Sequence, residues 1–531
     1  MVDLASSRRR PWAPDGRDSR PNTKRRKHEI SVGGAHPLGV QPLGNLMMRD
    51  YESVGRATTM RTEQLGAFAV LSDELVTLLL QELDARSLRQ LGYASRVMSA
   101  FATQDDLWKQ LLVRRGMTPT HWYGTWRRTY YDIVRTEDDA AALRCDGFYS
   151  DALYRPFFCS ALELSAHIRN SGIGTIPRLD ALPTQAEFEQ TWAHRPFILT
   201  SSAYPSWPRL SLSALAQEYG DTEFVQECVR WKLGVYADYM AHNRDESPLY
   251  LFDREFAAKT RIGREYAVPG MFARDYLALM TDTRPDYRWL IIGPERSGST
   301  FHKDPNATCA WNAVVEGEKY WIMFPPEVLP PGVFTSEDES EVTSPLSIAE
   351  WFLGFYDAAI AAKGFQDGFC RVGEALYVPS GWWHLVVNLA PTVAITQNFV
   401  PLPDVLPVLR FFRFKRDQIS GFRRKATSAE GGDDEDENET PEIDVFDAFA
   451  RILLRLPDTQ SSGEVEHVEM TTAALVVPKE TKRKIEELVA AQSSGGVSKW
   501  EQLLAPATGN GENGGEEEIG FSFGFLEDED E

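Results

Sequence analysis

Cysteines are few in this sequence, odd in number and widely spaced. The five lie far apart, at positions 145, 159, 228, 309 and 370, and none forms a Cys-x-x-Cys motif. A disulfide framework or a thiolate zinc site would need closely spaced cysteines. The sequence therefore predicts neither, and the expectation is a reduced, intracellular protein.

Long apolar runs are also missing. No stretch approaches the roughly 20 apolar residues of a membrane span, and the Arg-rich N-terminus lacks the apolar segment of a secretory signal. We therefore expect no membrane association and no secretion. Two basic clusters, residues 8–10 and 24–27, lie in a Pro-, Ser- and Gly-rich leader. Import receptors recognise such clusters, which predicts a location in the nucleus, with the cytosol as the alternative.

The folded part has no excess of positive charge. The formal net charge is -22, from 56 basic and 78 acidic residues, and the tracts 433–439 and 512–531 hold 15 acids without a base. The rest of the chain carries about -7, an ordinary surface. Nucleic acid is therefore not expected as the main substrate. The basic and Phe-rich stretch 410–425 is predicted to be a helix whose aromatic side packs on the barrel, and the alternative is that it contacts nucleic acid.

Hydrophobic patterning divides the chain, of α+β class, into segments of different character. Folded segments show periodic apolar residues, whereas tails and linkers are polar and low in them. The expected segments are a disordered basic leader at 1–62, a helical domain at 63–115, a strand-rich domain at 130–410, an acidic linker at 426–440, a helical extension at 441–505 and an acidic disordered tail at 506–531.

Residues 63–115 have leucines at helical spacing. Ser72 can cap the first of three expected helices, whose leucines are followed by a Leu-x-x-Leu second helix, a Ser-Arg step at 95–96 and a closing Leu-Trp at 107–108. This order resembles the F-box. The resemblance implies docking through residues 71–112 to the Skp-type adaptor of cullin-RING ubiquitin ligases. The alternative is a small helical subdomain that packs on its own neighbour.

Residues 130–410 contain short apolar runs rich in aromatic and β-branched residues. Pro and Gly separate these runs, which lie at 195–199, 287–292, 320–324, 375–378 and 393–396. Each has the length of a strand. Because no long helices alternate with them, the pattern favours an antiparallel barrel or jelly roll over a doubly wound sheet.

Two of the nine histidines lie in strand-like, aromatic surroundings. His302 and Asp304 are separated by one residue, so on a strand both project from one face while Lys303 points away. His384, from a later strand, would complete two imidazoles and one carboxylate around a metal. Such a set leaves positions open, as non-haem Fe(II) requires in order to bind a co-substrate and O2.

Lys319 directly precedes the aromatic run 320–324. Burying an ammonium group there is costly without an anion, and a dicarboxylic co-substrate would supply that anion. The alternative is that Lys319 extends its ammonium group past the aromatic side chains to solvent. The sequence leaves both interpretations open.

Several short motifs occur in one order between residues 180 and 400. They are Ser-Pro-Leu-Tyr at 247–250, Tyr-Arg-Trp at 287–289, Gly-Pro-Glu-Arg-Ser-Gly at 293–298, His-x-Asp-Pro at 302–305, Ala-Trp-Asn-Ala at 310–313, Gly-Trp-Trp-His at 381–384 and Ala-Ile-Thr-Gln-Asn-Phe at 394–399. Together they resemble the Jumonji-C oxygenases, most closely the branch of bifunctional arginine demethylases and lysyl hydroxylases. The resemblance implies a double-stranded β-helix, the cupin-like jelly roll.

The family's roles map onto positions of this chain. The resemblance implies Fe(II), 2-oxoglutarate and O2 as cofactors and His302, Asp304 and His384 as metal ligands. Lys319 would bind the distal carboxylate of 2-oxoglutarate. Either Ser299 or Thr300 would add a hydroxyl, since Ser299 stands where relatives carry Thr. The remaining implied pocket residues are Tyr250, Asn312, Asn388 and Thr396.

Two function classes follow from these features. The first is a protein oxygenase that hydroxylates lysine or demethylates N-methyl-arginine, on histones or other nuclear proteins. The second is an F-box substrate receptor of a ubiquitin ligase whose barrel only binds. The complete ligand set favours the oxygenase, because binding alone needs no open coordination positions. The sequence does not distinguish hydroxylation from demethylation.

Overall fold

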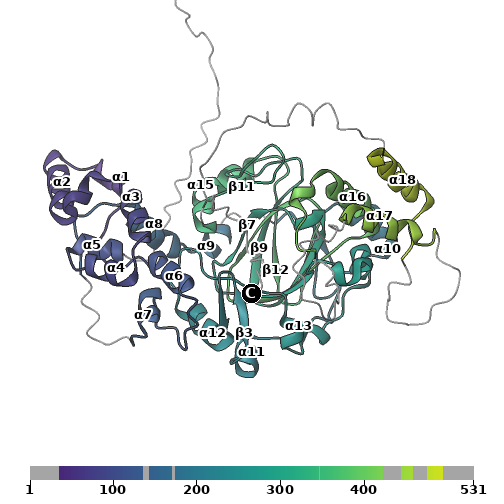
Figure 1. The fold of residues 1–531 in the computed structure, drawn as a ribbon, viewed down its shortest axis with the longest axis horizontal. Helices are drawn as coiled ribbons and strands as arrows, with labels where there is room; N and C mark the ends of the chain where they lie inside the picture. The colour runs from purple at the N-terminus through teal and green to yellow at the C-terminus, as the bar shows by residue number, and fades with distance from the viewer. Residues whose placement is uncertain are drawn as a thin grey trace, which may run out of the picture.

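The computed structural model describes residues 35–134, 143–169, 174–345, 347–422, 444–458 and 475–493. N-terminal helices lie on one side of a central barrel and C-terminal helices on the other (Figure 1). The basic clusters of the leader, the acidic linker 426–440 and the tail 506–531 lie outside the described residues. In the described residues, no helix is both long and apolar enough to cross a membrane.

Two sheets form the barrel, as the jelly-roll prediction requires. The larger has the strand order β1-β2-β13-β8-β15-β6-β5-β3-β4 and the smaller the order β12-β9-β14-β7. Only the β1–β2 pair among these is parallel. The larger sheet comprises β1 (Arg178–Leu179), β2 (Phe197–Leu199), β3 (Glu223–Gln226), β4 (Val229–Lys232), β5 (Leu251–Asp253), β6 (Arg288–Gly293), β8 (Cys309–Glu316), β13 (Ala375–Val378) and β15 (Thr392–Phe399). The smaller comprises β7 (Gly298–His302), β9 (Glu318–Phe324), β12 (Gln366–Arg371) and β14 (Trp383–Asn388).

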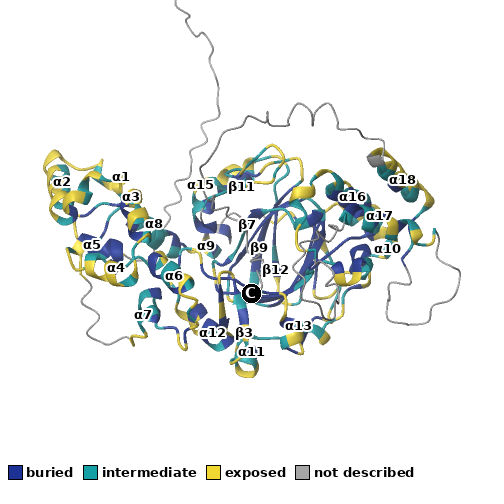
Figure 2. Cartoon of the chain, in the orientation of Figure 1, coloured by how far each residue is buried: buried dark blue, intermediate teal, exposed yellow. Residues whose placement is uncertain are grey.

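Strand alternation in β9 shows how the sequence builds two layers. Trp321 and Met323 point inward and pack against residues of the larger sheet. Tyr320 and Ile322 point outward against α15 (Ile348–Ala361). Both faces are therefore covered, and the strands form the buried centre of the molecule (Figure 2). All five runs predicted as strands contain one.

The leucine-rich region forms four helices where three were predicted. They are α3 (Asp73–Gln81), α4 (Ala85–Leu91), α5 (Arg96–Ala102) and α6 (Asp105–Arg114). Ser72 caps the first by accepting a hydrogen bond from the backbone of Leu75, as expected. Gln104 adopts a non-helical conformation, and this separates α5 from α6. The Trp108 indole donates to the carbonyl of Ala102 at 2.8 Å and ties α6 back to α5.

The prediction of a disordered leader over 1–62 is wrong for its last part. Residues in this range form α1 (Leu43–Leu46) and most of α2 (Tyr51–Leu65). Arg61 joins α2 to α3 through an ion pair with Asp73 at 2.6 Å. The helix escaped prediction because Leu65 is its single buried residue, so no apolar stripe marks it.

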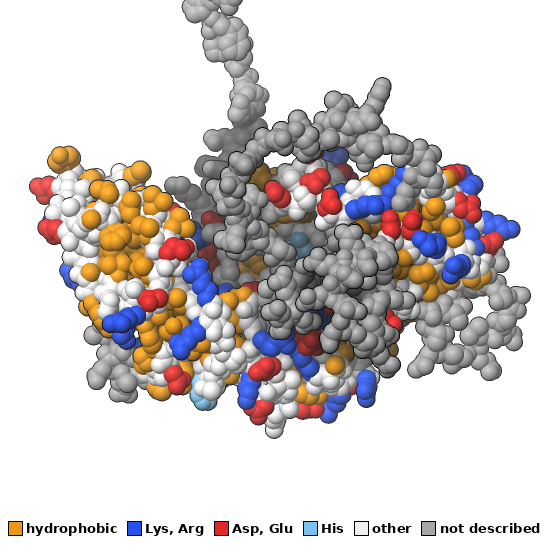
Figure 3. All heavy atoms as spheres, in the orientation of Figure 1, with side chains coloured by type: hydrophobic (Ala, Val, Ile, Leu, Met, Phe, Trp, Pro, Cys, Tyr) orange, Lys and Arg blue, Asp and Glu red, His pale blue; other side chains and the backbone are white. Residues whose placement is uncertain are grey.

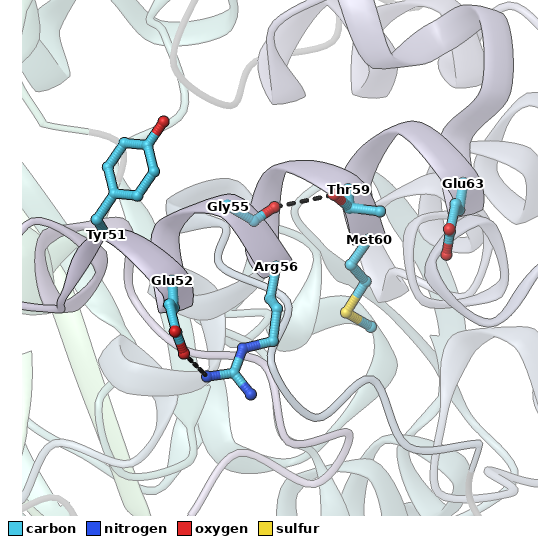
Figure 4. A pocket seen from close by; sticks show the side chains of 7 residues that line it. All are labelled: Tyr51, Glu52, Gly55, Arg56, Thr59, Met60 and Glu63. Carbon is cyan, nitrogen blue, oxygen red and sulfur yellow. Dashed lines mark hydrogen bonds and ion pairs between the residues drawn. The ribbon is translucent and has the colours of Figure 1, made fainter.

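A pocket lies along α2 (Figure 4), a helix that is apart from the barrel (Figure 1). All its lining residues belong to this helix, and Glu52 and Arg56 form an ion pair of 3.7 Å there. Its lining contains no histidine or cysteine. The residues are Tyr51, Glu52, Gly55, Arg56, Thr59, Met60 and Glu63.

Further helices connect and cover the barrel. From the N-terminal side, α7 (Trp126–Tyr131), α8 (Asp151–Ser160) and α9 (Leu164–Arg169) lead into it, and α12 (Leu233–His242) precedes β5. On the other side lie α16 (Val405–Phe414), α17 (Val445–Arg455) and α18 (Lys479–Ser493). Phe412 of α16 is buried against Phe449 of α17, with ring centroids 6.0 Å apart. The predicted aromatic packing of residues 410–425 holds for Phe412, whereas α16 ends at Phe414, which is 68% exposed, and residues 423–425 lie outside the described residues. α17 and α18 lie within the range 441–505 that was predicted as a helical extension.

Candidate metal centre and co-substrate site

The structure brings His302, Asp304 and His384 together. β7 pairs with β14 so that His302 lies directly opposite His384, with ring centroids 4.1 Å apart. Asp304 follows the end of β7. One potential ligand atom from each of the three residues lies within 4.8 Å of the others. The sequence positions are 82 residues apart, and the antiparallel pairing removes that separation.

Both imidazoles are held in one orientation. His302 Nδ1 lies 2.7 Å from the carbonyl of Thr300, and His384 Nδ1 lies 3.0 Å from that of Trp382. An Nδ1–H that donates to a carbonyl leaves Nε2 as the lone-pair donor, the form that binds a metal. Burial lowers the pKa of each imidazole to about 4, and repulsion from His384 adds to the effect at His302. Both rings are therefore neutral at pH 7.

Asp304 supplies an unsatisfied buried oxygen. Among the described residues, its Oδ2 has no hydrogen-bond partner. Burial raises the pKa of the Asp304 carboxyl to about 6, against the opposing effects of His302 and a hydrogen bond with Asn398. A buried carboxylate oxygen without a donor is costly unless a cation satisfies it. Two neutral imidazoles and this oxygen fit a divalent metal of the non-haem iron type.

Lys319 is completely buried inside the barrel. It is 0% exposed, so the alternative in which it reaches solvent is wrong. Its ammonium group donates a hydrogen bond to Tyr250 Oη, and within the described ranges no carboxylate pairs with it. Burial lowers the pKa of Lys319 to about 7. A buried cation without a protein anion fits a carboxylate-bearing ligand.

Other buried polar groups on the barrel strands also lack partners within the described residues. Asn388 lies opposite Lys319 in the β14–β9 pair, and Asn312 lies on β8. The Oδ1 atoms of both, together with Thr300 Oγ1, are buried with no hydrogen bond in the described part of the chain. Thr396 differs, because its hydroxyl donates to the carbonyl of Trp311 at 2.8 Å. Buried polar atoms without a partner, one of them on the residue paired with Lys319, are consistent with a polar ligand in this interior.

Comparison with known proteins identifies the family. Residues 238–404 match the model of the cupin-like domain. The chain is 39% identical over 389 residues to the arginine-specific demethylase JMJ22 of Arabidopsis thaliana, which covers 71% of this chain and 75% of that protein. The chain belongs to the Jumonji-type, cupin-like oxygenases.

Two further relatives are less completely covered. Identity is 35% over 358 residues to the lysine-specific demethylase JMJ21 of Arabidopsis thaliana, over 64% of this chain and 38% of that protein. The identity to the bifunctional arginine demethylase and lysyl-hydroxylase psr-1 of Caenorhabditis briggsae is 34% over 256 residues, which cover 44% of this chain and 63% of that protein. The chain thus spans less than two thirds of either. The predicted oxygenase class is confirmed.

A β-bulge in this Jumonji-type oxygenase bears on the hydroxyl that the sequence left open. Ser299 pairs with Val386 and His302 with His384, so three steps along β7 match two along β14. Val386 belongs to the same hydrophobic cluster as Trp321 and Met323, which point into the barrel. Directly paired residues project their side chains from the same face of a sheet. Ser299 is therefore on the inner face with His302, although an odd separation would otherwise place them on opposite faces. Thr300 lies in the bulge between Ser299 and His302, and its hydroxyl has no hydrogen-bond partner in the described residues.

Lys303 and Asn398 complete the surroundings of the site. Lys303 points outward as expected, with its ammonium group 2.9 Å from Glu339 and 4.7 Å from the centroid of the Trp383 ring. Asn398 was not predicted as a site residue. It bonds to Asp304 and donates to Thr308 Oγ1 at 2.9 Å. The sequence could have indicated Asn398, because it lies two residues after the predicted pocket residue Thr396 and alternation along a strand puts both side chains on one face.

Proposed function

We propose that this protein is an Fe(II)- and 2-oxoglutarate-dependent protein oxygenase that hydroxylates lysine side chains or demethylates N-methyl-arginine. The observation that carries the proposal is the convergence of His302, Asp304 and His384 in the same barrel interior as Lys319, a buried cation without an acidic partner. The relatives named as arginine demethylase and as lysyl-hydroxylase support the substrate class.

Each residue has a separate task in this function. His302, Asp304 and His384 would hold the iron, which together with 2-oxoglutarate would supply the chemistry for inserting oxygen into a C–H bond. Lys319 and Tyr250 bind and orient the distal carboxylate of 2-oxoglutarate. The covered barrel limits the access of water. Oxygen inserted at a lysine carbon gives a stable alcohol, whereas at an N-methyl carbon it gives a product that loses formaldehyde.

The proposed setting is the nucleus, with histones or other basic nuclear proteins as substrates. The two basic clusters at 8–10 and 24–27 support nuclear import, and both lie outside the described residues. The acidic tracts of the chain are suited to contact basic partners. Microscopy of the intact chain beside a variant with residues 24–27 changed to alanine tests the location.

Succinate release tests the activity directly. Purified protein is incubated with Fe(II), ascorbate and 2-oxoglutarate, with and without histone peptides that carry lysine or methylated arginine. His302→Ala should abolish substrate-dependent succinate, whereas Lys303→Ala, the neighbour that points outward, should retain it. The product mass separates the gain of an oxygen atom from the loss of a methyl group. Succinate formation that survives His302→Ala would contradict the proposal.

We further propose that residues 71–112 dock a Skp-type adaptor. On α3, Leu75, Leu78 and Leu79 are 49%, 55% and 48% exposed, whereas Val76 and Leu80 are buried. Hydrophobic side chains also gather over the N-terminal helices on the side of the molecule that Figure 3 shows. A leucine face left uncovered supports docking over the self-contained subdomain. Docking and oxygenase activity are compatible in one chain, so a barrel that only binds is not required.

A further inference from the structure

The segment that carries Tyr250 has no regular secondary structure of its own. Residues 243–250 run from α12 to β5 without helix or strand. Backbone ladders therefore do not fix this segment, and its position depends on side chains that reach it from elsewhere. Tyr250 accepts the hydrogen bond of Lys319, so any displacement of the segment changes the co-substrate site.

Asp245 anchors the start of the segment from the N-terminal side. Its two carboxylate oxygens accept from the indole Nε1 of Trp126 at 3.0 and 2.9 Å, and Oδ2 also accepts from Tyr239 Oη at 2.7 Å. Tyr239 Oη in turn accepts from the backbone N–H of Leu249 at 2.8 Å. Three successive contacts thus connect Trp126 to the residue before Tyr250.

Trp126 is itself fixed by the helices that precede the barrel. It begins α7, is completely buried, and its backbone N–H donates to Asp105 of α6 at 3.2 Å. The ammonium group of Lys109, also on α6, lies 5.5 Å from the Trp126 ring centroid. α6 is the last helix of the leucine-rich region, so this region packs directly behind the segment.

Two arginines hold the same segment at further points. Arg155 of α8 forms an ion pair with Glu246, whose carboxylate also accepts from Ser347 Oγ at 2.8 Å. Arg296, in the turn between β6 and β7, donates to the carbonyl of Asp245 at 2.9 Å. The helices before the barrel therefore contribute two independent contacts, from Trp126 and Arg155.

We propose that Trp126 and Arg155 are positioning residues for 2-oxoglutarate, because they hold the segment 245–250 and thereby set Tyr250 against Lys319. The inference rests on the proposed role of Tyr250 in co-substrate binding. It makes the helices before the barrel part of the oxygenase site, in addition to any docking role. Removing a donor from a buried carboxylate leaves that charge under-satisfied, so the segment should move.

Direct binding of 2-oxoglutarate tests the proposal without turnover. The full chain is loaded with Mn(II) and titrated with 2-oxoglutarate by calorimetry. Trp126→Phe, which keeps a ring and removes the indole N–H, should weaken 2-oxoglutarate binding by about tenfold. Its Mn(II) affinity should stay unchanged, because no metal ligand lies in the segment.

Trp122→Phe is the matched control. Its ring lies 5.3 Å from that of Trp126, and its indole nitrogen is buried without a partner in the described residues. The same substitution there removes no hydrogen bond, so 2-oxoglutarate should bind within about twofold of the original affinity. Equal weakening in both variants would overturn the proposal, because it would point to loss of aromatic packing.

Arg155→Gln provides a second test at a less buried position, where its side chain is 34% exposed. This variant and Trp126→Phe should speed amide hydrogen exchange in residues 245–251 and weaken 2-oxoglutarate binding. Faster exchange with unchanged binding, or no change in either, would overturn the positioning role. If the original protein binds Mn(II) but not 2-oxoglutarate, the proposed function fails instead, and the exchange data then report on the segment alone.

Discussion

His302 and His384 face each other across the β7–β14 pair with ring centroids 4.1 Å apart, and each Nδ1 bonds to the carbonyl two residues earlier in the chain. The same local contact therefore orients both rings from two separate strands. Within the described residues no such backbone contact orients Asp304, whose carboxylate instead has a hydrogen bond with the side chain of Asn398. Backbone carbonyls thus orient the two imidazoles, whereas a side chain orients the carboxylate.

Asn398→Ala should lower the metal affinity by about 10-fold, within the range expected for loss of a partner that orients a ligand. The reason is that Asp304 would lose the hydrogen bond that holds its carboxylate. Titration with Mn(II), followed by electron paramagnetic resonance, measures the change. Ser336→Ala, in an exposed loop, should bind Mn(II) as the original protein does. Unaltered affinity in Asn398→Ala would show that Asp304 is held without it.

Lys319→Met should abolish measurable 2-oxoglutarate binding, with a loss of at least about 100-fold, because a carboxylate would lose its charged partner. The fold should be retained or stabilised, since methionine removes an unpaired buried charge. Calorimetry and the melting temperature report the two effects separately. Binding that persists in this variant would assign the carboxylate to another group.

Binding of 2-oxoglutarate should weaken as the pH rises from 7 to 9. Burial lowers the pKa of Lys319 to about 7, so the ammonium form that a carboxylate needs prevails below pH 7 and declines above it. The association constant should therefore fall by about tenfold per pH unit above 7. Asp304, with a pKa of about 6, and the two histidines, with values of about 4, keep their charge state across this range.

Lys319→Arg is the comparison for the pH series. Its guanidinium group stays charged up to pH 9, so this variant should lack the slope. An equal slope in both proteins would assign the titration to a different group.

The double variant Leu75→Asp, Leu79→Asp should lose capture of a Skp-type adaptor while retaining 2-oxoglutarate binding. Charges on an apolar docking face oppose its burial, and neither position is in the core. A pull-down with purified adaptor measures the effect. Leu329→Asp, at a residue 47% exposed outside these helices, is the matched control. Adaptor capture by the double variant would contradict the docking proposal.

The sequence was sufficient for local and periodic features. The spacing of His302 and Asp304, the strand lengths and the cap at Ser72 all follow from short-range patterns, and the structure contains them. The 15-residue helix α2 lacked an apolar stripe and was missed for that reason.

Long-range relationships lay beyond the sequence. The burial of Lys319 depends on which strands surround β9, and the inward position of Ser299 depends on a bulge that no residue type announces. Asp245 shows the same limit, because its partner Trp126 is 119 positions away in the chain. Contacts of this kind are decided by tertiary packing rather than by local propensity.

The irregular course of residues 243–250 has a practical consequence for choosing domain boundaries. A fragment trimmed to residues 174–422 would retain every strand of the two sheets, all three ligand positions and Lys319, yet it would lack Trp126 and Arg155. This fragment should still bind metal, but it should bind 2-oxoglutarate with lower affinity than the full chain. Failure of an isolated barrel in an assay would therefore be a product of where it was cut.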